Sequence, residues 1–247
     1  MESEKITERE SETTDPIGWS YNDACGAAHA LDLVGERWTL LAMRELMMGP
    51  KRFTDLRASL PGISANVLTQ RLTKLEAVGV VERVTLPPPA GRAYQLTPWG
   101  YEARPIFMVL GRWGARSPRH DPTLPLTANS ILMSFETMLD AERAAGVALA
   151  IGLTIGGESF RVAVAQGALR VERDGPGPVA AGIVTPAAPP LAGWVYGGVP
   201  LETLEADGVM RVTGDRGVLA TFRTLFVLPA KAGLEDCANG GCDRRES

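Results

Sequence analysis

The stretch MMGPKRFTDLRASLPGISANVLTQRLTKLEAVGVVERVTLPPPAGRAYQLTP, residues 47–98, decides the fold of this chain. After a short extended KRF segment, it predicts a helix that has Thr54 as its N-cap and ends at Pro61-Gly62. A second helix is expected to follow its N-cap, Ser64, and to end at Gly79. Two strand-like runs around a tip of proline and glycine then predict a β-hairpin. Two helices joined by a short turn and followed by a hairpin are typical of a winged helix-turn-helix.

The second helix of this stretch has an apolar face and a polar face. Its leucines recur at helical spacing and must face the core: Leu68, Leu72 and Leu75. Asn66, Gln70 and Lys74 lie nearly opposite. Asn and Gln can bond adenine bidentately in the major groove, while Lys74 and the backbone amides near Ser64 suit phosphates. A polar helix face alone is more often only solvated, so the interpretation depends on the order of the elements and on the charge.

The charges of the chain are unevenly distributed. The 247 residues have a net charge of −4, yet residues 21–120 carry thirteen basic and eight acidic groups, a net +5. Residues 1–20 have a net charge of −4 and residues 121–247 a net charge of −5. Because the basic block coincides with the winged-helix pattern, we expect only this part of the chain to meet a polyanion.

Composition shifts divide the chain. Apolar residues at helical spacing from Cys25 to Leu46 predict an amphipathic helix, or a closely joined pair that meets at Gly35. The segment SPRHDPTLPLT, residues 117–127, contains three prolines and indicates a linker. The expected organisation is a polar tail at 1–20, a winged-helix domain at 21–117, a linker at 118–127, a second domain at 128–229 and a tail at 230–247.

Residues 22–116 resemble the HxlR-type winged-helix regulators. The matching elements agree in order and spacing: Gly35-x-x-Trp38, the RF-x-x-L run from Arg52 to Leu56, Gly62-Ile63-Ser64, and LTQRL-x-x-L-E from Leu68 to Glu76. The resemblance implies cytoplasmic homodimers that bind double-stranded operator DNA, with helix 64–78 in the major groove and the hairpin as a wing.

The resemblance also assigns site residues. It implies a dimer contact from the first helix and from helix 98–114, which offers Ile106, Phe107, Val109, Leu110 and Trp113. Arg71 flanks the polar face of the recognition helix, and Arg92 at the hairpin tip is expected to reach the minor groove or the DNA backbone. The predicted DNA-binding residues are Thr54, Ser64, Asn66, Val67, Gln70, Arg71, Lys74 and Arg92.

Cys25 coincides with the cysteine that precedes the first helix in this family, which some members use to sense quinones, aldehydes or oxidants. A helix N-terminus lowers the pKa of a thiol, which favours a reactive thiolate. The family residue after it is typically proline, whereas here it is Gly26, so a small buried or dimer-facing thiol is the alternative interpretation. Cys237 and Cys242 lack two further ligands for zinc and are interpreted as incidental thiols.

An α+β pattern follows the linker, with a helix over 128–146, three alternating strands between 147 and 174, and a strand over 180–186. The stretch from Leu191 to Phe226 resembles the sterol-carrier-protein fold through Gly208, Gly214 and Asp215, the last as the N-cap of helix 217–226. This resemblance implies helices over one face of a mostly antiparallel sheet, with an apolar tunnel between the layers. The candidate lining residues, which could equally form only the core, are Phe135, Met138, Leu139, Trp194, Met210, Phe222, Leu225 and Phe226.

The sequence offers no catalytic constellation, because the only histidines are His29 in the first helix and His120 in the linker. We therefore expect an α+β protein that is not an enzyme and needs no metal or cofactor. It has no apolar run of the length of a membrane helix and no signal-peptide pattern, so we expect no membrane partner.

The main hypothesis is a homodimeric transcriptional regulator, a repressor rather than an activator, whose second domain binds a small hydrophobic effector. The alternative is a redox or electrophile sensor that acts through Cys25, with the second domain serving dimerisation or protein interaction. A third reading is a lipid carrier that retains a vestigial winged helix.

Overall fold

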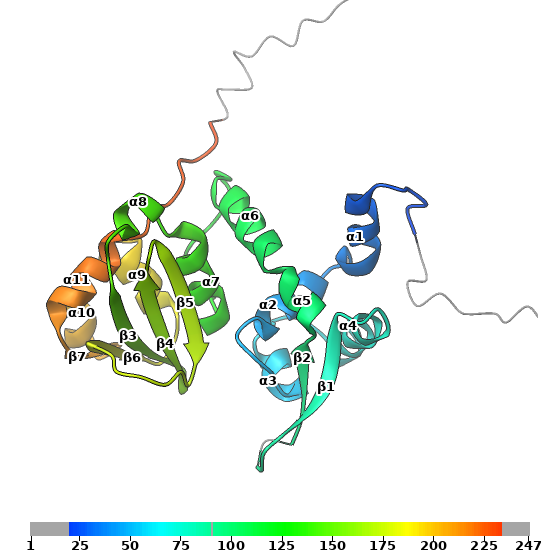
Figure 1. Ribbon diagram of the computed structural model, residues 1–247, viewed down its shortest axis with the longest axis horizontal. Helices are drawn as coiled ribbons and strands as arrows, with labels where there is room; N and C mark the ends of the chain where they lie inside the picture. Colours follow the sequence, from blue (N-terminus) through cyan, green and yellow to red (C-terminus); the bar gives the residue numbers. More distant parts are fainter. Residues whose placement is uncertain (1–19, 90, 234–247) are drawn as a thin grey trace, which may run out of the picture.

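A two-stranded hairpin and a five-stranded sheet divide the molecule into two lobes (Figure 1). The computed structural model describes residues 20–89 and 91–233. The expected tails, with Cys237 and Cys242, lie largely or wholly outside these residues. Within them, no helix is long and apolar enough to cross a membrane.

The first lobe has the predicted order of helices followed by a hairpin. Its elements are α1 (Gly26–Val34), α2 (Thr39–Leu46), α3 (Phe53–Ala58), α4 (Ala65–Ala77), β1 (Val81–Leu86), β2 (Gly91–Leu96), α5 (Pro98–Glu102) and α6 (Arg104–Ala115). The three leucines of α4 are buried. They join the core beside Ala42, Met43 and Leu46 of α2. Of the two alternatives for residues 25–46, the structure has the closely joined helix pair, and the predicted helix-turn-helix and wing are confirmed.

Two local predictions in this lobe are wrong. Arg52, not Thr54, is the N-cap residue of α3, and Thr54 lies in the first helical turn. The single helix expected over 98–114 is broken at Ala103 into α5 and α6. The break is explained by Pro105, which has no N–H to continue the hydrogen-bond ladder of α5 and stands in the first turn of α6.

The second lobe is a sheet of order β5-β4-β3-β6-β7, in which β3 and β6 are parallel and all other pairs antiparallel. The strands are β3 (Leu149–Ile155), β4 (Glu158–Ala165), β5 (Ala168–Arg173), β6 (Ala181–Thr185) and β7 (Arg211–Gly214). The helices are α7 (Ala128–Met138), α8 (Ala141–Ala144), α9 (Pro189–Val195), α10 (Leu201–Ala206) and α11 (Arg216–Thr224).

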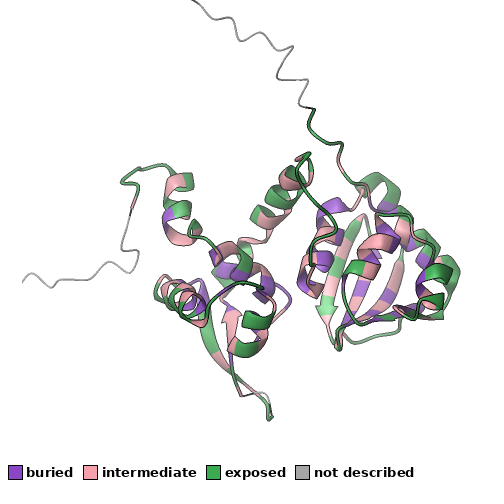
Figure 2. Ribbon diagram, turned by 180° about the vertical axis from the view of Figure 1, so that it is seen from behind, coloured by how far each residue is buried: buried purple, intermediate pink, exposed green. Residues whose placement is uncertain are grey.

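Helices cover one face of this sheet, as expected (Figures 1 and 2). The alternating buried residues of β3 and β4, such as Leu153 and Val162, belong to the shared core. Asp215 caps α11 by accepting hydrogen bonds from the backbone amides of Gly217 and Val218. The helix predicted over 128–146 is instead two helices, because Leu139 is extended and Asp140 caps α8.

Candidate nucleic-acid interface

The turn before α4 fixes how this helix is presented. Gly62 has a φ of +91°, a left-handed conformation that favours glycine, and the neighbouring Ile63 is buried and anchors the turn. Ser64 is the N-cap, as predicted, and its hydroxyl accepts a hydrogen bond from the Val67 amide at 3.2 Å. The first-turn amides that the cap does not pair make this end of α4 suited to a phosphate.

The exposed face of α4 carries two amide side chains. Asn66 and Gln70 are both exposed, and neither side chain has a hydrogen-bond partner among the residues that the structure describes. Val67 is partly buried against the core. Asn66 and Gln70 are thus available for hydrogen bonds to base edges, whereas Val67 offers only part of its surface.

Arg71 and Lys74 face Glu36, in the connection between α1 and α2. Lys74 Nζ lies 2.9 Å from Glu36 Oε1, the Arg71 guanidinium pairs with the other carboxylate oxygen, and Arg71 Nε donates to the Arg37 carbonyl. The Lys74 side chain is only 13% exposed. The hydrogen bond from Lys74, with the neighbouring Arg71 charge, lowers the pKa of Glu36. A phosphate at these two cations would therefore compete with Glu36.

The wing lies beside α4, joined to it by a short connection (Figure 1). Arg92 is exposed on β2 opposite Thr85, next to the tip rather than in it. Arg83 of β1 pairs with Glu76 of α4 at 2.8 Å and lies over the Tyr94 ring. Thr54 is exposed on α3, where its hydroxyl donates to Asp55. The sequence did not single out Lys51, whose backbone forms an isolated β-bridge with Tyr94 of the wing.

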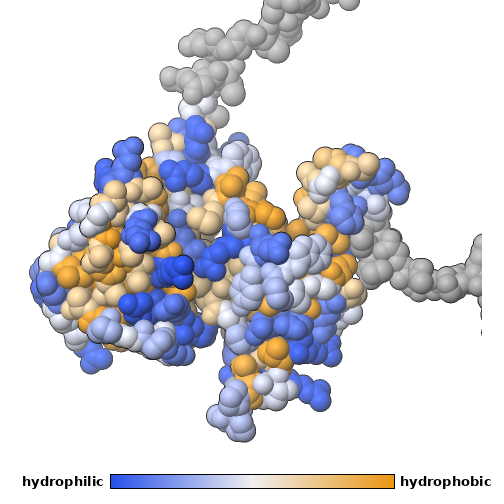
Figure 3. All heavy atoms as spheres, viewed as in Figure 1, coloured by the Kyte–Doolittle hydropathy of each residue, from blue (hydrophilic) through white to orange (hydrophobic). Residues whose placement is uncertain are grey.

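One face of α6 exposes large apolar side chains. Trp113 is 74% and Val109 is 70% exposed, and Ile106 and Leu110 are also exposed. Phe107 is instead partly buried against the core. Figure 3 shows apolar atoms gathered over this part of the molecule. Such a cluster of exposed apolar residues on one helix face is typical of a protein–protein contact.

Cys25 is the N-cap residue of α1 and is exposed. The backbone amides of Ala28 and Ala27, in the first turn of α1, lower the pKa of its thiol. The sulfur therefore has the exposure and the electrostatic environment that reactive cysteines require.

The candidate ligand residues of the second lobe gather between sheet and helices. All are buried except Leu139, which is partly buried and bridges to Phe226. The rings pack directly on one another, with centroids 4.8 Å apart for Phe222 and Phe226 and 5.6 Å apart for Phe135 and Phe222. Met210 also lines a hollow of about 590 Å³ at the ends of β3, β6 and β7. In the part of the chain that is described, no group of three or more acidic, His or Cys residues could hold a metal ion.

The helix order, the capped α4 and the wing define the first lobe as the winged helix-turn-helix of a transcriptional regulator. Residues 33–121 match the HxlR-like helix-turn-helix family. The uncharacterized HTH-type transcriptional regulator sll1512 of Synechocystis sp. is 36% identical over 92 residues, which span 37% of this chain and 68% of the relative. The chain therefore belongs to the HxlR-like helix-turn-helix family.

Three further similarities involve two other proteins. The HTH-type transcriptional regulator YodB of Bacillus subtilis is 39% identical over 34% of this chain and 76% of its own length. The reduced form of YodB covers 40% of this chain and 100% of its own, at 34% identity and a TM-score of 0.35. The sec-alkylsulfatase Pisa1 from Pseudomonas sp. covers 41% of this chain and 16% of its own, at 18% identity and a TM-score of 0.38. These scores assign no function, and the sterol-carrier resemblance of the second lobe stays a prediction.

Proposed function

We propose that the protein is a homodimeric repressor that binds double-stranded operator DNA through α4 and the wing. The observation that carries this proposal is the capped N-terminus of α4, with Asn66 and Gln70 exposed and unpartnered among the described residues, beside a wing that exposes Arg92. The DNA-binding domain would span residues 21–117 and the second domain residues 128–229.

Each predicted DNA contact has a different basis. Asn66 and Gln70 would bond base edges in the major groove. Ser64 and the amides it leaves unpaired would hold a phosphate, and Arg92 would reach the minor groove or the backbone. Thr54 and Val67 would contact the DNA at the rim of this surface. Arg71 and Lys74 would contact phosphates only in competition with their ion pairs to Glu36.

A mobility-shift titration with the DNA upstream of the gene tests this function. Replacing both Asn66 and Gln70 by Ala removes the two amides, and each lost bidentate contact should cost about 1–3 kcal/mol of specific binding. Affinity for unrelated DNA should stay the same, since phosphate contacts dominate it. Thr221→Ala, on α11 of the second lobe, is the control. Unchanged specific affinity of the double variant would refute the recognition face.

The exposed face of α6 supports the homodimer, with a second copy of the chain as its occupant. Ile106, Leu110 and Trp113 would form its centre, and Phe107 would back them from the core side. An operator with two half-sites requires two recognition helices about 34–36 Å apart, and only a dimer supplies them. Apolar helix faces of this kind commonly form permanent interfaces.

The second domain would bind a small hydrophobic effector. Its candidate lining residues belong to one hydrophobic core, in which the rings of Phe135, Phe222 and Phe226 pack on one another, and this core would have to open for a ligand to enter between helices and sheet. Native mass spectrometry of the purified chain tests dimer and effector together. A dimer heavier than two chains, whose extra mass is lost when the protein is denatured in organic solvent, would support a bound effector. A dimer with the mass of two chains alone would refute an effector that copurifies with the protein.

A second candidate function is redox or electrophile sensing, favoured by the exposed, acidified thiol of Cys25. A structure of the relative YodB is described as quinone-bound. In this reading the second domain serves only dimerisation or protein interaction. A quinone should then release operator DNA from the wild-type chain and leave the Cys25→Ser variant bound. Equal release from both would refute a role of this thiol.

A further inference from the structure

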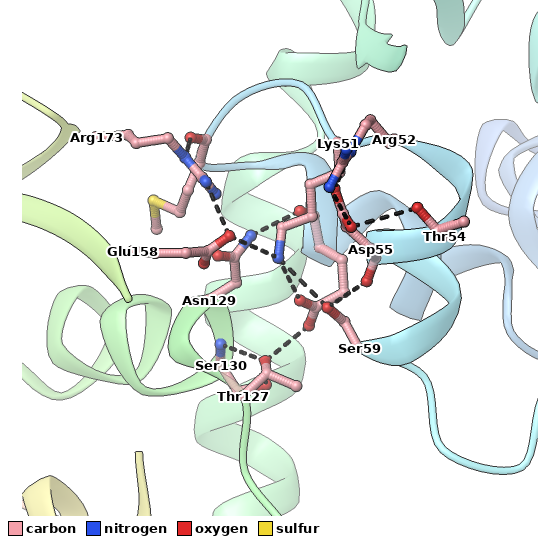
Figure 4. A network of polar contacts seen from close by, with 12 residues as sticks. Lys51, Arg52, Thr54, Asp55, Ser59, Thr127, Asn129, Ser130, Glu158 and Arg173 are labelled. Carbon is pink, nitrogen blue, oxygen red and sulfur yellow. Dashed lines mark hydrogen bonds and ion pairs between the residues drawn. The ribbon is translucent and has the colours of Figure 1, made fainter. Parts of the chain in front are cut away.

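The two lobes meet at a polar network that is largely buried (Figure 4). We call it the junction network and define it by the six residues Glu45, Lys51, Thr127, Asn129, Glu158 and Arg173. Glu45 on α2 is fully buried and accepts hydrogen bonds from Lys51, Thr127 and its neighbour Arg44. Asn129, also buried, donates to the backbone carbonyl of Glu45 at 2.6 Å. Hydrogen bonds thus join the start of α7 to the end of α2.

Lys51 has two roles in this network. Its backbone N–H and carbonyl pair with the carbonyl and N–H of Tyr94 at 3.0 and 2.9 Å, so residue 51 is hydrogen-bonded to β2 of the wing. Its side chain, only 6% exposed, places Nζ 3.5 Å from Glu45 and 3.8 Å from Glu158 of β4. One residue therefore touches the wing through its backbone and the second lobe through its side chain.

The second lobe also holds the backbone before Lys51. Arg173 of β5 donates from Nε to the Met48 carbonyl at 3.1 Å and pairs through Nη1 with Glu158 at 2.9 Å. Its guanidinium lies over the Phe160 ring, which restrains it further. Glu158 is thus shared between Arg173 and Lys51, as Figure 4 shows. Side chains of β4 and β5 thus contact both ends of segment 48–51, whose last residue forms the β-bridge to the wing.

The burial of Lys51 makes its ion pairs with Glu45 and Glu158 important for its position. A lysine ammonium that is almost out of water needs its carboxylate partners, because an unpaired buried charge is strongly unfavourable. Removing the charge of Glu158 leaves Lys51 with the Ser59 hydroxyl and with one ion-paired carboxylate among the described residues, that of Glu45, which already neutralises Arg44. Lys51 would then shift toward Glu45 or toward water, and its backbone pairing with Tyr94 would move with it.

We propose that Glu158 and Arg173 of the second lobe are positioning residues for DNA binding, because they fix the base of the wing through Lys51 and Met48. The proposal rests on DNA binding by α4 and the wing. The second lobe is then part of the support of the DNA-binding surface. A change at the β4–β5 edge alters the contact of the wing with DNA and leaves the contact of α4 in place.

Full-length variants test this role. Glu158→Gln keeps the shape of the side chain and removes its charge, and Glu172→Gln, on the next strand and paired with Arg161, is the matched control. Amide hydrogen exchange in the absence of DNA measures how firmly the wing is held by Lys51. The Tyr94 amide should exchange at least about tenfold faster in Glu158→Gln, since its hydrogen bond to Lys51 opens more readily, and stay unchanged in Glu172→Gln. Equal exchange in both variants would overturn the proposal.

A double-mutant cycle with Arg92→Ala then measures the effect on DNA. Glu158→Gln should weaken operator binding about tenfold, the size of one weakened charge-assisted hydrogen bond. Arg92→Ala should weaken it in the wild-type background but have little further effect in Glu158→Gln, because the wing has already lost its contact. Additive losses would overturn the positioning role. Arg173→Lys, which keeps the charge but loses the Nε hydrogen bond to Met48, should behave like Glu158→Gln.

The two proposals fail in different ways. If the wild-type chain binds no operator, the proposed DNA-binding function fails, while Tyr94 exchange still reports whether the second lobe holds the wing. If the wild-type chain binds and Asn66→Ala weakens binding, but Glu158→Gln does not, then the positioning role fails alone.

Discussion

The two lobes use their large side chains in opposite ways. The first lobe leaves Trp99 and Trp113 about half or more exposed, together with the apolar face of α6. The second lobe buries its tryptophan, Trp194, and packs it against Phe222 with centroids 6.2 Å apart. The exposed large side chains of the first lobe are available to partners. The buried aromatic rings of the second lobe already contact one another. Substitutions should therefore change binding in the first lobe and stability in the second.

The largest effect should come from Phe222→Ala in the second lobe. The ring is fully buried and contacts three other aromatic rings, so its loss should cost about 3–5 kcal/mol of unfolding free energy. Urea unfolding of the full-length chain measures this. A loss below about 1 kcal/mol would indicate that the ring faces open space rather than a packed core, and the second lobe would then not differ from the first in this respect.

Next in size is the effect of Trp113→Glu on α6. A charge at the centre of the apolar face should raise the dimer dissociation constant roughly thirtyfold or more, which corresponds to about 2 kcal/mol. Sedimentation equilibrium reports this constant. Leu124→Glu changes another exposed apolar residue, outside α6, and is the control. Equal dissociation constants for the two variants would place the dimer contact elsewhere.

Arg92→Ala should have a smaller effect, confined to DNA binding. If Arg92 contacts a phosphate, affinity should fall by a similar factor on all sequences, and the slope of log affinity against log salt should decrease by about 1. Arg170→Ala, an exposed arginine on β5 of the second lobe, is the control and should change neither quantity. A loss confined to particular base pairs would instead assign Arg92 to the minor groove.

The smallest effect should come from Glu36→Gln. The pKa of Glu36 is lowered in the folded chain, so its ion pairs stabilise the fold above the ordinary carboxyl pKa, and this stabilisation is lost as the pH falls through the acidic range. Because the carboxylate is 41% exposed, the contribution is at most about 1 kcal/mol. Unfolding curves of the two proteins should therefore differ slightly at neutral pH and converge in acid. A constant difference at all pH values would contradict this origin.

Local signals in the sequence predicted local structure well. Ser64 and Asp215 act as N-caps as expected, because a cap depends on the three residues that follow it. The leucines of α4 faced the core because helical spacing alone determines a shared face. Pro105 is the sequence signal for the break before α6.

Contacts between distant segments could not be predicted in this way. The helical wheel gave the direction of Lys74 but not its partner Glu36, which lies 38 residues away in sequence. Likewise, nothing around Lys51 indicates that Glu158 and Arg173 will hold it, because the junction network exists only once both lobes are folded. The resemblance of the first lobe to a known family indicates a transcriptional regulator; its action as a dimeric repressor and the effector of the second lobe are proposals.

We propose that two copies of α4 in one dimer read the operator DNA. Hydroxyl-radical footprinting of the full-length chain on the DNA upstream of its gene tests it most directly. We predict two protected tracts whose centres lie about one helical turn, or a whole multiple of it, apart, both lost when Asn66 and Gln70 are replaced by Ala. A single tract, or protection that survives this double replacement, would contradict the claim.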